Sequence, residues 1–160
     1  MIRQRIEKHI QVLDEARQFL LATLAKIGER GDEQIYSDGA QWSIRQLAIH
    51  LLIADKGHNN MIFGAARGEN VIPEDYDLER FNKRSVDKSA ELSLEQVEAG
   101  LIHSRAEMLA WLAELDDSIL DKTARHATLR ILSISQMLDI MAWHETTHAK
   151  DIRHFLEGGA

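Results

Sequence analysis

Hydrophobic residues recur along most of the chain at the three-to-four-residue spacing of helices that bury one face. Four segments carry such a stripe: residues 2–27, 43–65, 93–115 and 133–156. Each of the last three segments opens with a serine followed three residues later by a glutamine, the pattern of a helix-capping box. These pairs are Ser43 and Gln46, Ser93 and Gln96, and Ser133 and Gln136. The pattern therefore predicts four amphipathic helices.

The same pattern indicates the fold class. No segment alternates between apolar and polar residues for long enough to predict a strand, and four amphipathic helices predict an all-α four-helix bundle. The connection between the second and third helices, residues 67–92, is long enough to cross the bundle and to let those two helices run parallel. Its charged part, residues 77–88, is typical of a short solvated helix. We expect residues 1–160 to form a single domain.

The composition excludes several kinds of function. With 26 acidic and 19 basic residues the net charge is −7, which opposes binding to nucleic acid. No stretch approaches the roughly 18 apolar residues of a membrane span, and the charged N-terminal segment lacks the apolar run of a signal peptide. We therefore expect a cytoplasmic protein that binds neither nucleic acid nor membranes. Because the sequence has no cysteine, only His, Asp or Glu side chains can bind a metal ion.

The last predicted helix contains a match to the His-Glu-x-x-His signature of zinc proteases, at His144, Glu145 and His148. Such proteases need a third ligand, and His154 follows at the spacing used by one branch of them. That branch has a glycine at the seventh position, where the chain turns out of the helix. Here Asp151 occupies it and the helical pattern continues, so His154 lies about 15 Å along the axis from His144. His154 therefore cannot bind the same metal ion as His144 and His148, and a zinc protease is left as a distant alternative.

A third ligand is available from the second predicted helix. His144 and His148 are four residues apart and therefore lie on one helix face, which the hydrophobic stripe directs inward. His50 also lies on an inward stripe, and an unpaired polar group buried there costs a few kcal/mol. Taken alone, His50 is better explained as a core histidine that is hydrogen-bonded to a neighbouring helix. Taken with the pair, it predicts a metal site between two helices of the bundle.

Two motifs in this order resemble the DinB/YfiT-like family of metal-binding four-helix bundles. They are WSIRQLAIH at residues 42–50 and AWHETTHAKDI at residues 142–152, and the intervening segment 76–115 is similar to the middle of that family. The resemblance implies that His50, His144 and His148 hold a divalent ion, zinc or nickel. It also implies a homodimer. Some members of the family are S-transferases or isomerases that use low-molecular-weight thiols.

Three neutral imidazoles would leave coordination positions open for water or substrate, as in catalytic metal sites. A divalent ion there can activate a bound water or bind an incoming thiol as thiolate. The second chemistry suits a protein without cysteine, because the thiol would arrive with a cosubstrate. We therefore predict a metal-dependent enzyme acting on a small molecule, of the thiol S-transferase type or a related transferase or hydrolase. The alternatives are a bundle that binds a metal or small ligand without catalysis, and a bundle whose inward histidines are only structural.

Three carboxylates and one further histidine lie near these motifs in the sequence. Glu145 points about 100° away from His144 on the helix, which predicts a solvated or interhelical carboxylate, with a general-base role as the alternative. Asp139 and Asp151 are candidates to orient an imidazole. His58 lies two turns beyond His50 and nearly on its face, where it can line the pocket.

The remaining histidines are predicted to lie on the surface: His9, His103, His126 and His154. The three tryptophans are predicted to be core or interface residues: Trp42, Trp111 and Trp143.

Overall fold

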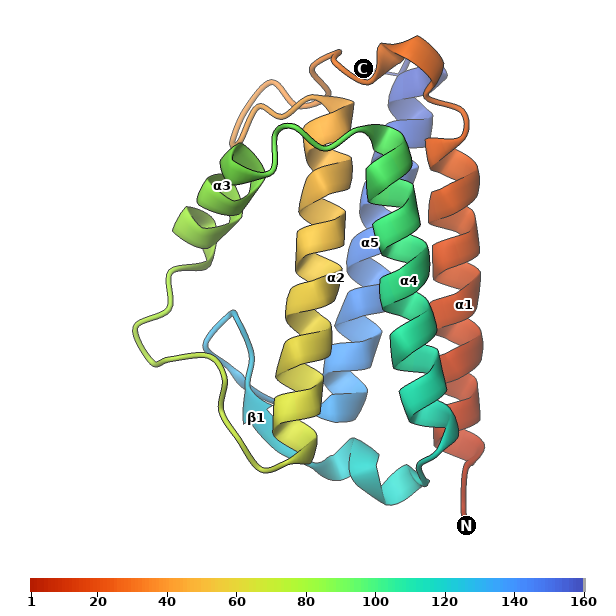
Figure 1. Cartoon of the computed structure of the whole chain (residues 1–160), viewed down its shortest axis with the longest axis vertical. Coiled ribbons are helices and arrows are strands. Elements are labelled where there is room, and N and C mark those ends of the chain that lie inside the picture. The colour runs from red at the N-terminus through yellow and green to blue at the C-terminus, as the bar shows by residue number, and fades with distance from the viewer. Residues whose placement is uncertain (160) are drawn as a thin grey trace.

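The computed structural model describes residues 1–159, which form five α-helices and one small hairpin. Four of the helices make up the bundle: α1 (Gln4–Leu24), α2 (Ile44–Ala66), α4 (Leu94–Ala113) and α5 (Ile134–Leu156). Figure 1 shows that α1 and α5 run in one direction and that α2 and α4 run in the other. The predicted all-α bundle is confirmed, and its second and third long helices run parallel as the long connection allowed.

The three predicted capping boxes are all formed. At the starts of α2, α4 and α5, the serine hydroxyl accepts a hydrogen bond from the glutamine backbone N–H, and the glutamine side chain accepts one from the serine N–H. Each box satisfies two backbone donors that a helix otherwise leaves unpaired. Shorter 3-10 helices follow α1 and α4, namely η1 (Gly28–Arg30) and η2 (Asp117–Asp121). Local sequence therefore determines where three of the four bundle helices begin.

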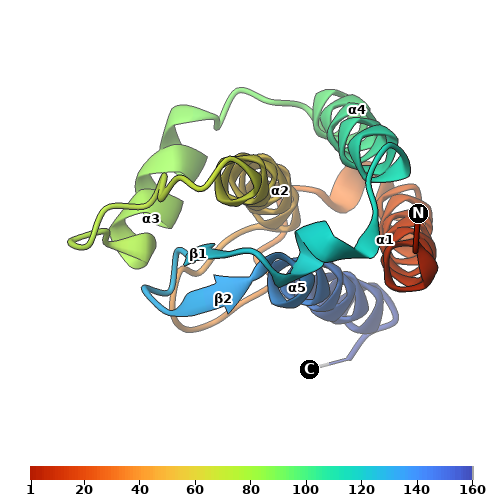
Figure 2. The same ribbon diagram turned by 90° about the horizontal axis from the view of Figure 1, so that it is seen from below.

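The crossing connection contains the short helix predicted there. Helix α3 (Leu78–Lys88) begins after Asp77, whose side chain accepts a hydrogen bond from the backbone N–H of Arg80. It packs against α2 and stands off the rest of the bundle (Figure 2). Val86 is its one buried residue within the part of the chain that the structure describes.

The two strands were not predicted. Strand β1 (Thr123–Arg125) pairs antiparallel with β2 (Ile131–Ser133), and Ala124 lies opposite Leu132. Three residues are too few to show an alternating pattern, which is why the sequence did not indicate them. The hairpin leads directly into α5 and packs its β1 strand on α2.

The apolar core consists of two clusters, one towards each end of the bundle. Each long helix carries one buried charged residue between the part that belongs to one cluster and the part that belongs to the other. These residues are Arg17 on α1, Asp55 on α2, Arg105 on α4 and Glu145 on α5. On α1, for example, Arg17 separates Leu13 of one cluster from Leu20 of the other. Each of the four is at most 6% exposed.

These four residues, the buried quartet, form a closed set of ion pairs. The Arg17 guanidinium donates to Asp55 Oδ1 at 2.9 Å and to Glu145 Oε2 at 2.8 Å. The Arg105 guanidinium donates to the same Asp55 oxygen at 3.0 Å and also pairs with Glu145. Each arginine additionally donates to a backbone carbonyl of a neighbouring helix. The charges sum to zero, and every helix of the bundle contributes one of them.

No helix within residues 1–159 is both long enough and apolar enough to cross a membrane.

The quartet predicts a large effect of a single substitution. Arg105→Met keeps much of the side-chain volume but leaves two buried carboxylates with one cation, and we expect it to lower the free energy of unfolding by about 3–5 kcal/mol. Urea denaturation measures this change. The control Arg84→Met, on exposed α3, should change stability by less than about 0.5 kcal/mol. Similar stabilities of the two variants would contradict the role given to the quartet.

Candidate metal centre

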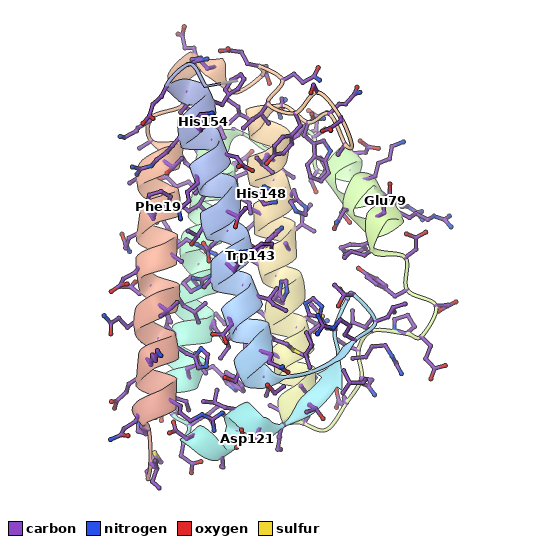
Figure 3. All side chains as sticks on the ribbon, turned by 180° about the vertical axis from the view of Figure 1, so that it is seen from behind. Phe19, Glu79, Asp121, Trp143, His148 and His154 are labelled. Atoms are coloured by element: carbon purple, nitrogen blue, oxygen red, sulfur yellow. The ribbon has the colours of Figure 1, made fainter. Side chains whose placement is uncertain are left out.

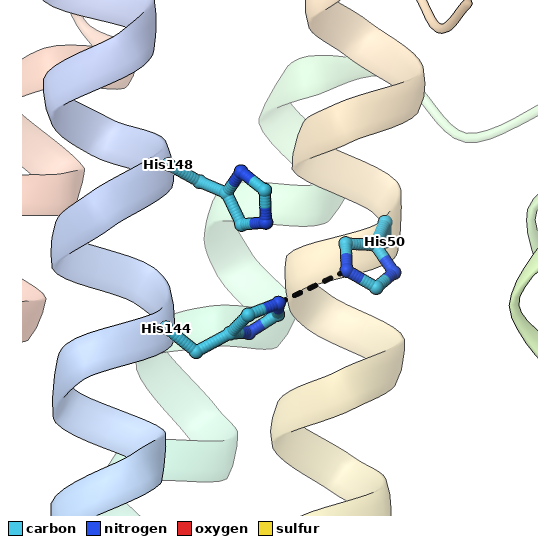
Figure 4. A group of neighbouring side chains, drawn as sticks. All are labelled: His50, His144 and His148. Atoms are coloured by element: carbon cyan, nitrogen blue, oxygen red, sulfur yellow. Dashed lines mark hydrogen bonds between the residues drawn. The ribbon is translucent and has the colours of Figure 1, made fainter. Parts of the chain in front are cut away.

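The antiparallel packing of α2 and α5 brings the three predicted histidines together. One ring nitrogen from each of His50, His144 and His148 lies within 4.8 Å of the other two (Figure 4). The Nε2 atoms of His50 and His144 are 3.2 Å apart. Zinc binds imidazole nitrogens at about 2.0–2.1 Å, so tetrahedral coordination places two such nitrogens about 3.3 Å apart. The spacing of His50 and His144 therefore matches two ligands of a single divalent ion, and His148 lies close enough to be the third candidate.

The surroundings keep these imidazoles neutral. Burial, together with the neighbouring histidines, lowers the pKa of His50 to about 4 and that of His144 to about 3. Burial also lowers the pKa of His148, against the opposing effect of the Asp151 carboxylate. A neutral imidazole is the form that binds a metal ion. The cluster is thus ready to act as a ligand set at neutral pH.

His148 is held in place by a tyrosine that the sequence did not point to. The Tyr36 hydroxyl donates to Asp151 Oδ2 at 2.5 Å, and its oxygen lies 2.8 Å from Nδ1 of His148. Because the tyrosine proton is directed to Asp151, Nδ1–H of His148 is the donor to Tyr36, which leaves the Nε2 lone pair free. Asp151 therefore orients an imidazole, as the sequence suggested it could. Tyr36 lies in a loop without periodicity, 112 residues from His148, and no local signal marks it.

His50 is supported by packing instead. The Trp42 ring lies against its imidazole, with ring centroids 4.8 Å apart at an angle of 35°. Its Nδ1 is buried and has no hydrogen-bond partner within residues 1–159. The tryptophan that opens the WSIRQLAIH motif is thus part of the wall of the site.

Glu145 belongs to the buried quartet and is an interhelical carboxylate. Both of its oxygens accept hydrogen bonds from arginines, one from Arg17 and one from Arg105. Its two oxygens are therefore both engaged in ion pairs with other helices. A small cavity lies beside it, and His144 and His58 line this cavity together with three members of the quartet, Arg17, Asp55 and Glu145. The cavity has room for about one water molecule.

His58 is buried and makes a pair with His126 outside the three-histidine cluster. Its Nδ1 donates to the carbonyl of Ala54 at 2.9 Å, and its Nε2 lies 2.9 Å from Nε2 of His126. Nδ1 of His126 accepts from the backbone N–H of Thr128. The prediction of a surface position for His126 is wrong: it is 3% exposed, because the hairpin folds it against α2. Burial and the neighbouring His58 lower its pKa to about 4.

The other sequence candidates lie away from the centre. Helix α5 continues unbroken through Leu156 and leaves His154 exposed, so His154 does not approach the cluster. His103 is also exposed, on α4. Asp139 lies beside His9 at the α1 side of α5, not beside a candidate ligand. Figure 3 shows α5 with α1 on one side and α2 on the other, and His148 labelled on it.

Comparisons with known proteins agree with this description. The sequence model of the DinB superfamily matches residues 3–152. Among solved structures, YfiT from Bacillus subtilis superimposes with a TM-score of 0.74 at 20% sequence identity, over 100% of this chain and 92% of that chain. YfiT is described as a probable metal-dependent hydrolase with an unusual four-helix bundle topology. No curated protein matches the sequence significantly.

The lowered pKa values predict how the metal-free protein responds to acid. An unfolded histidine binds a proton below about pH 6.5, whereas folded His50, His144 and His126 stay neutral down to about pH 4, 3 and 4. The unfolded state therefore binds more protons in this window, and stability falls as the pH falls. Between pH 7 and pH 5 we expect a loss of about 2 kcal/mol for each such histidine.

Urea denaturation of chelator-treated protein at several pH values measures this loss. The His126→Gln variant should lose less stability between pH 7 and pH 5 than the parent, whereas His103→Gln, at an exposed position, should follow the parent. A parent stability that does not change across this range would contradict the neutral state of the buried histidines.

Proposed function

The chain belongs to the DinB superfamily, and on that premise we propose that it is a divalent-metal-dependent enzyme whose ion is held by His50, His144 and His148. The observation that carries the proposal is the convergence of three neutral ring nitrogens within 4.8 Å of one another. Zinc and nickel both suit a set of imidazole ligands. Because three protein ligands do not complete a coordination shell, the site keeps a position for a small molecule.

The protein groups around the ion have separate tasks. When bound, the ion would supply Lewis-acid chemistry, which lowers the pKa of a water or thiol that binds it. The three histidines hold the ion between α2 and α5. Tyr36 and Asp151 fix the ring of His148 and increase its basicity as a ligand. Trp42 covers His50 and limits the access of water on that side.

For the reaction we propose transfer to or from a low-molecular-weight thiol. Two features support this class. The chain has no cysteine of its own, and both oxygens of the carboxylate nearest the site in sequence, Glu145, already accept hydrogen bonds from arginines. The description of YfiT favours hydrolysis as the second candidate. A bundle that binds metal without catalysis would satisfy the same geometry. The homodimer implied by the family resemblance stays a prediction.

Metal analysis of protein purified without a histidine tag or chelator tests the proposal. We expect about one zinc or nickel ion per chain, and its loss in His50→Ala and in His148→Ala because two imidazoles hold the ion far less tightly. His103→Ala, on the exposed face of α4, is the matched control and should keep the ion. Metal retained in both site variants would exclude these ligands.

Turnover assays on the same preparations separate the reaction classes. A thiol S-transferase should consume thiol in the presence of electrophilic substrates, whereas a hydrolase should act without thiol. Each activity should disappear in His148→Ala and in metal-depleted protein, and return when the depleted parent is reloaded. Bound metal without turnover in either assay would favour the non-catalytic alternative.

The contacts of Tyr36 give a further prediction. Tyr36→Phe removes the hydroxyl that joins His148 to Asp151, and we expect metal affinity to fall about 10- to 100-fold. Competition with a chromophoric chelator measures the dissociation constant. Tyr76→Phe, in the crossing connection, is the matched control and should bind metal as the parent does. An unchanged affinity in Tyr36→Phe would remove Tyr36 from the site.

A further inference from the structure

A second group of reactive side chains lies on the outer face shared by α1 and α5. His9 of α1 faces the first turns of α5, with its Nε2 2.8 Å from Oγ of Ser135. Its Nδ1 lies 3.5 Å from Oδ1 of Asp139, which follows Ser135 by one helical turn. A hydroxyl, an imidazole and a carboxylate therefore stand in the order that activates a serine as a nucleophile. None of the three belongs to the metal centre.

The neighbours of His9 favour the neutral tautomer that can accept a proton from Ser135. Asp139 beside Nδ1 favours the tautomer of His9 that carries its proton on Nδ1. Nε2 then presents a lone pair, which accepts the hydrogen bond from the Ser135 hydroxyl. Burial lowers the pKa of His9, more than the Asp139 carboxylate raises it, so the imidazole is neutral at pH 7. Contacts of this kind tighten when substrate binds.

The position of Ser135 at the start of α5 supplies a place for negative charge. Of the first three helical N–H groups, that of Ile134 donates to the carbonyl of Lys122, and that of Gln136 donates to Oγ of Ser133. The N–H of Ser135 has no acceptor within residues 1–159. It is therefore available to an oxyanion formed next to Oγ. The N-terminal end of this 23-residue helix favours a negative charge there as well.

Two adjoining hollows give room for a substrate. The first, of about 220 Å³, is lined by all three residues together with Arg5, Lys8 and Val12. Val12 and Asp139 also line the second hollow, of about 530 Å³, whose wall includes Trp143. Trp143 is 67% exposed and Val12 is 38% exposed, so an apolar surface lies next to the nucleophile. This exposure rules out the predicted core position for Trp143, and the interface position stays a prediction.

We propose that Ser135, His9 and Asp139 form a second active site, which hydrolyses small carboxylic esters with an aromatic or short aliphatic group. Ser135 is the nucleophile and His9 the general base. Asp139 is a positioning residue that acts through His9. The apolar part of the ester lies against Trp143 and Val12, and the carbonyl oxygen points to the Ser135 N–H.

The reaction proceeds in two balanced halves. Oγ of Ser135 attacks the carbonyl carbon while its proton passes to Nε2 of His9. The bond from carbon to the alkoxy oxygen then breaks, and the alcohol leaves with the proton from His9. In the second half, water attacks the acyl-serine while His9 takes one of its protons, and that proton returns to Oγ as the acid is released. The sum is ester and water giving acid and alcohol, with no metal required.

Hydrolysis of p-nitrophenyl acetate and labelling with an alkyl fluorophosphonate, both on chelator-treated full-length protein, test the proposal. We expect one phosphonyl adduct, located at Ser135 by peptide mass spectrometry, and ester hydrolysis that Ser135→Ala abolishes. Ser37→Ala, at an exposed loop serine, is the matched control and should be labelled and active. His148→Ala should also keep both properties, so failure of the metal centre and failure of this site are distinguishable.

Three further variants test the assigned roles in protein whose circular dichroism matches the parent. His9→Gln keeps a hydrogen-bonding side chain but cannot accept the proton, and kcat should fall about 100-fold or more. Asp139→Asn should lower kcat about tenfold with KM unchanged, and Asp139→Glu should restore most of it; a purely structural role would not separate kcat from KM in this way. An adduct at another residue, or equal rates in Ser135→Ala and Ser37→Ala, would overturn the proposal.

Discussion

The ion pairs of the buried quartet fix how the four long helices fit together. Desolvating these charges is costly unless every pair is made, and each pair is made only when all four helices stand at one relative height and rotation. Glu145 is adjacent to His144, and Asp55 lies little more than one turn after His50. The register that satisfies the quartet therefore also places the candidate metal ligands opposite one another. The apolar clusters on either side supply stability but would tolerate small shifts between helices more readily.

Helix α5 shows how this register organises chemistry. Towards α2 it carries His144 and His148, towards the bundle axis it carries Glu145, and towards α1 it carries Ser135 and Asp139. One continuous helix thus contributes to the candidate metal centre, to the ion pairs that align it, and to a separate polar cluster. Because its start is fixed by a capping box, all of these residues keep a constant relation to one another.

Periodicity and local motifs predicted the parts of the molecule that depend on neighbouring residues. The helices, their capping boxes and the inward direction of His50, His144 and His148 all follow from spacing along one helix. Tyr36 and His126 were missed because loops have no period, and their contacts lie on distant segments. The quartet left a signal that went unused: Arg17 falls between Leu13 and Leu20 on an apolar stripe. Which charges meet there depends on the packing of all four helices, which a single helix does not encode.

The most direct test of the metal centre is anomalous X-ray scattering from a crystal of protein purified without chelator, measured on both sides of the zinc and nickel absorption edges. We expect one anomalous peak between α2 and α5, about 2.0–2.1 Å from a ring nitrogen of each of the three histidines. A peak at another position, or none in crystals soaked with zinc and nickel, would contradict this expectation.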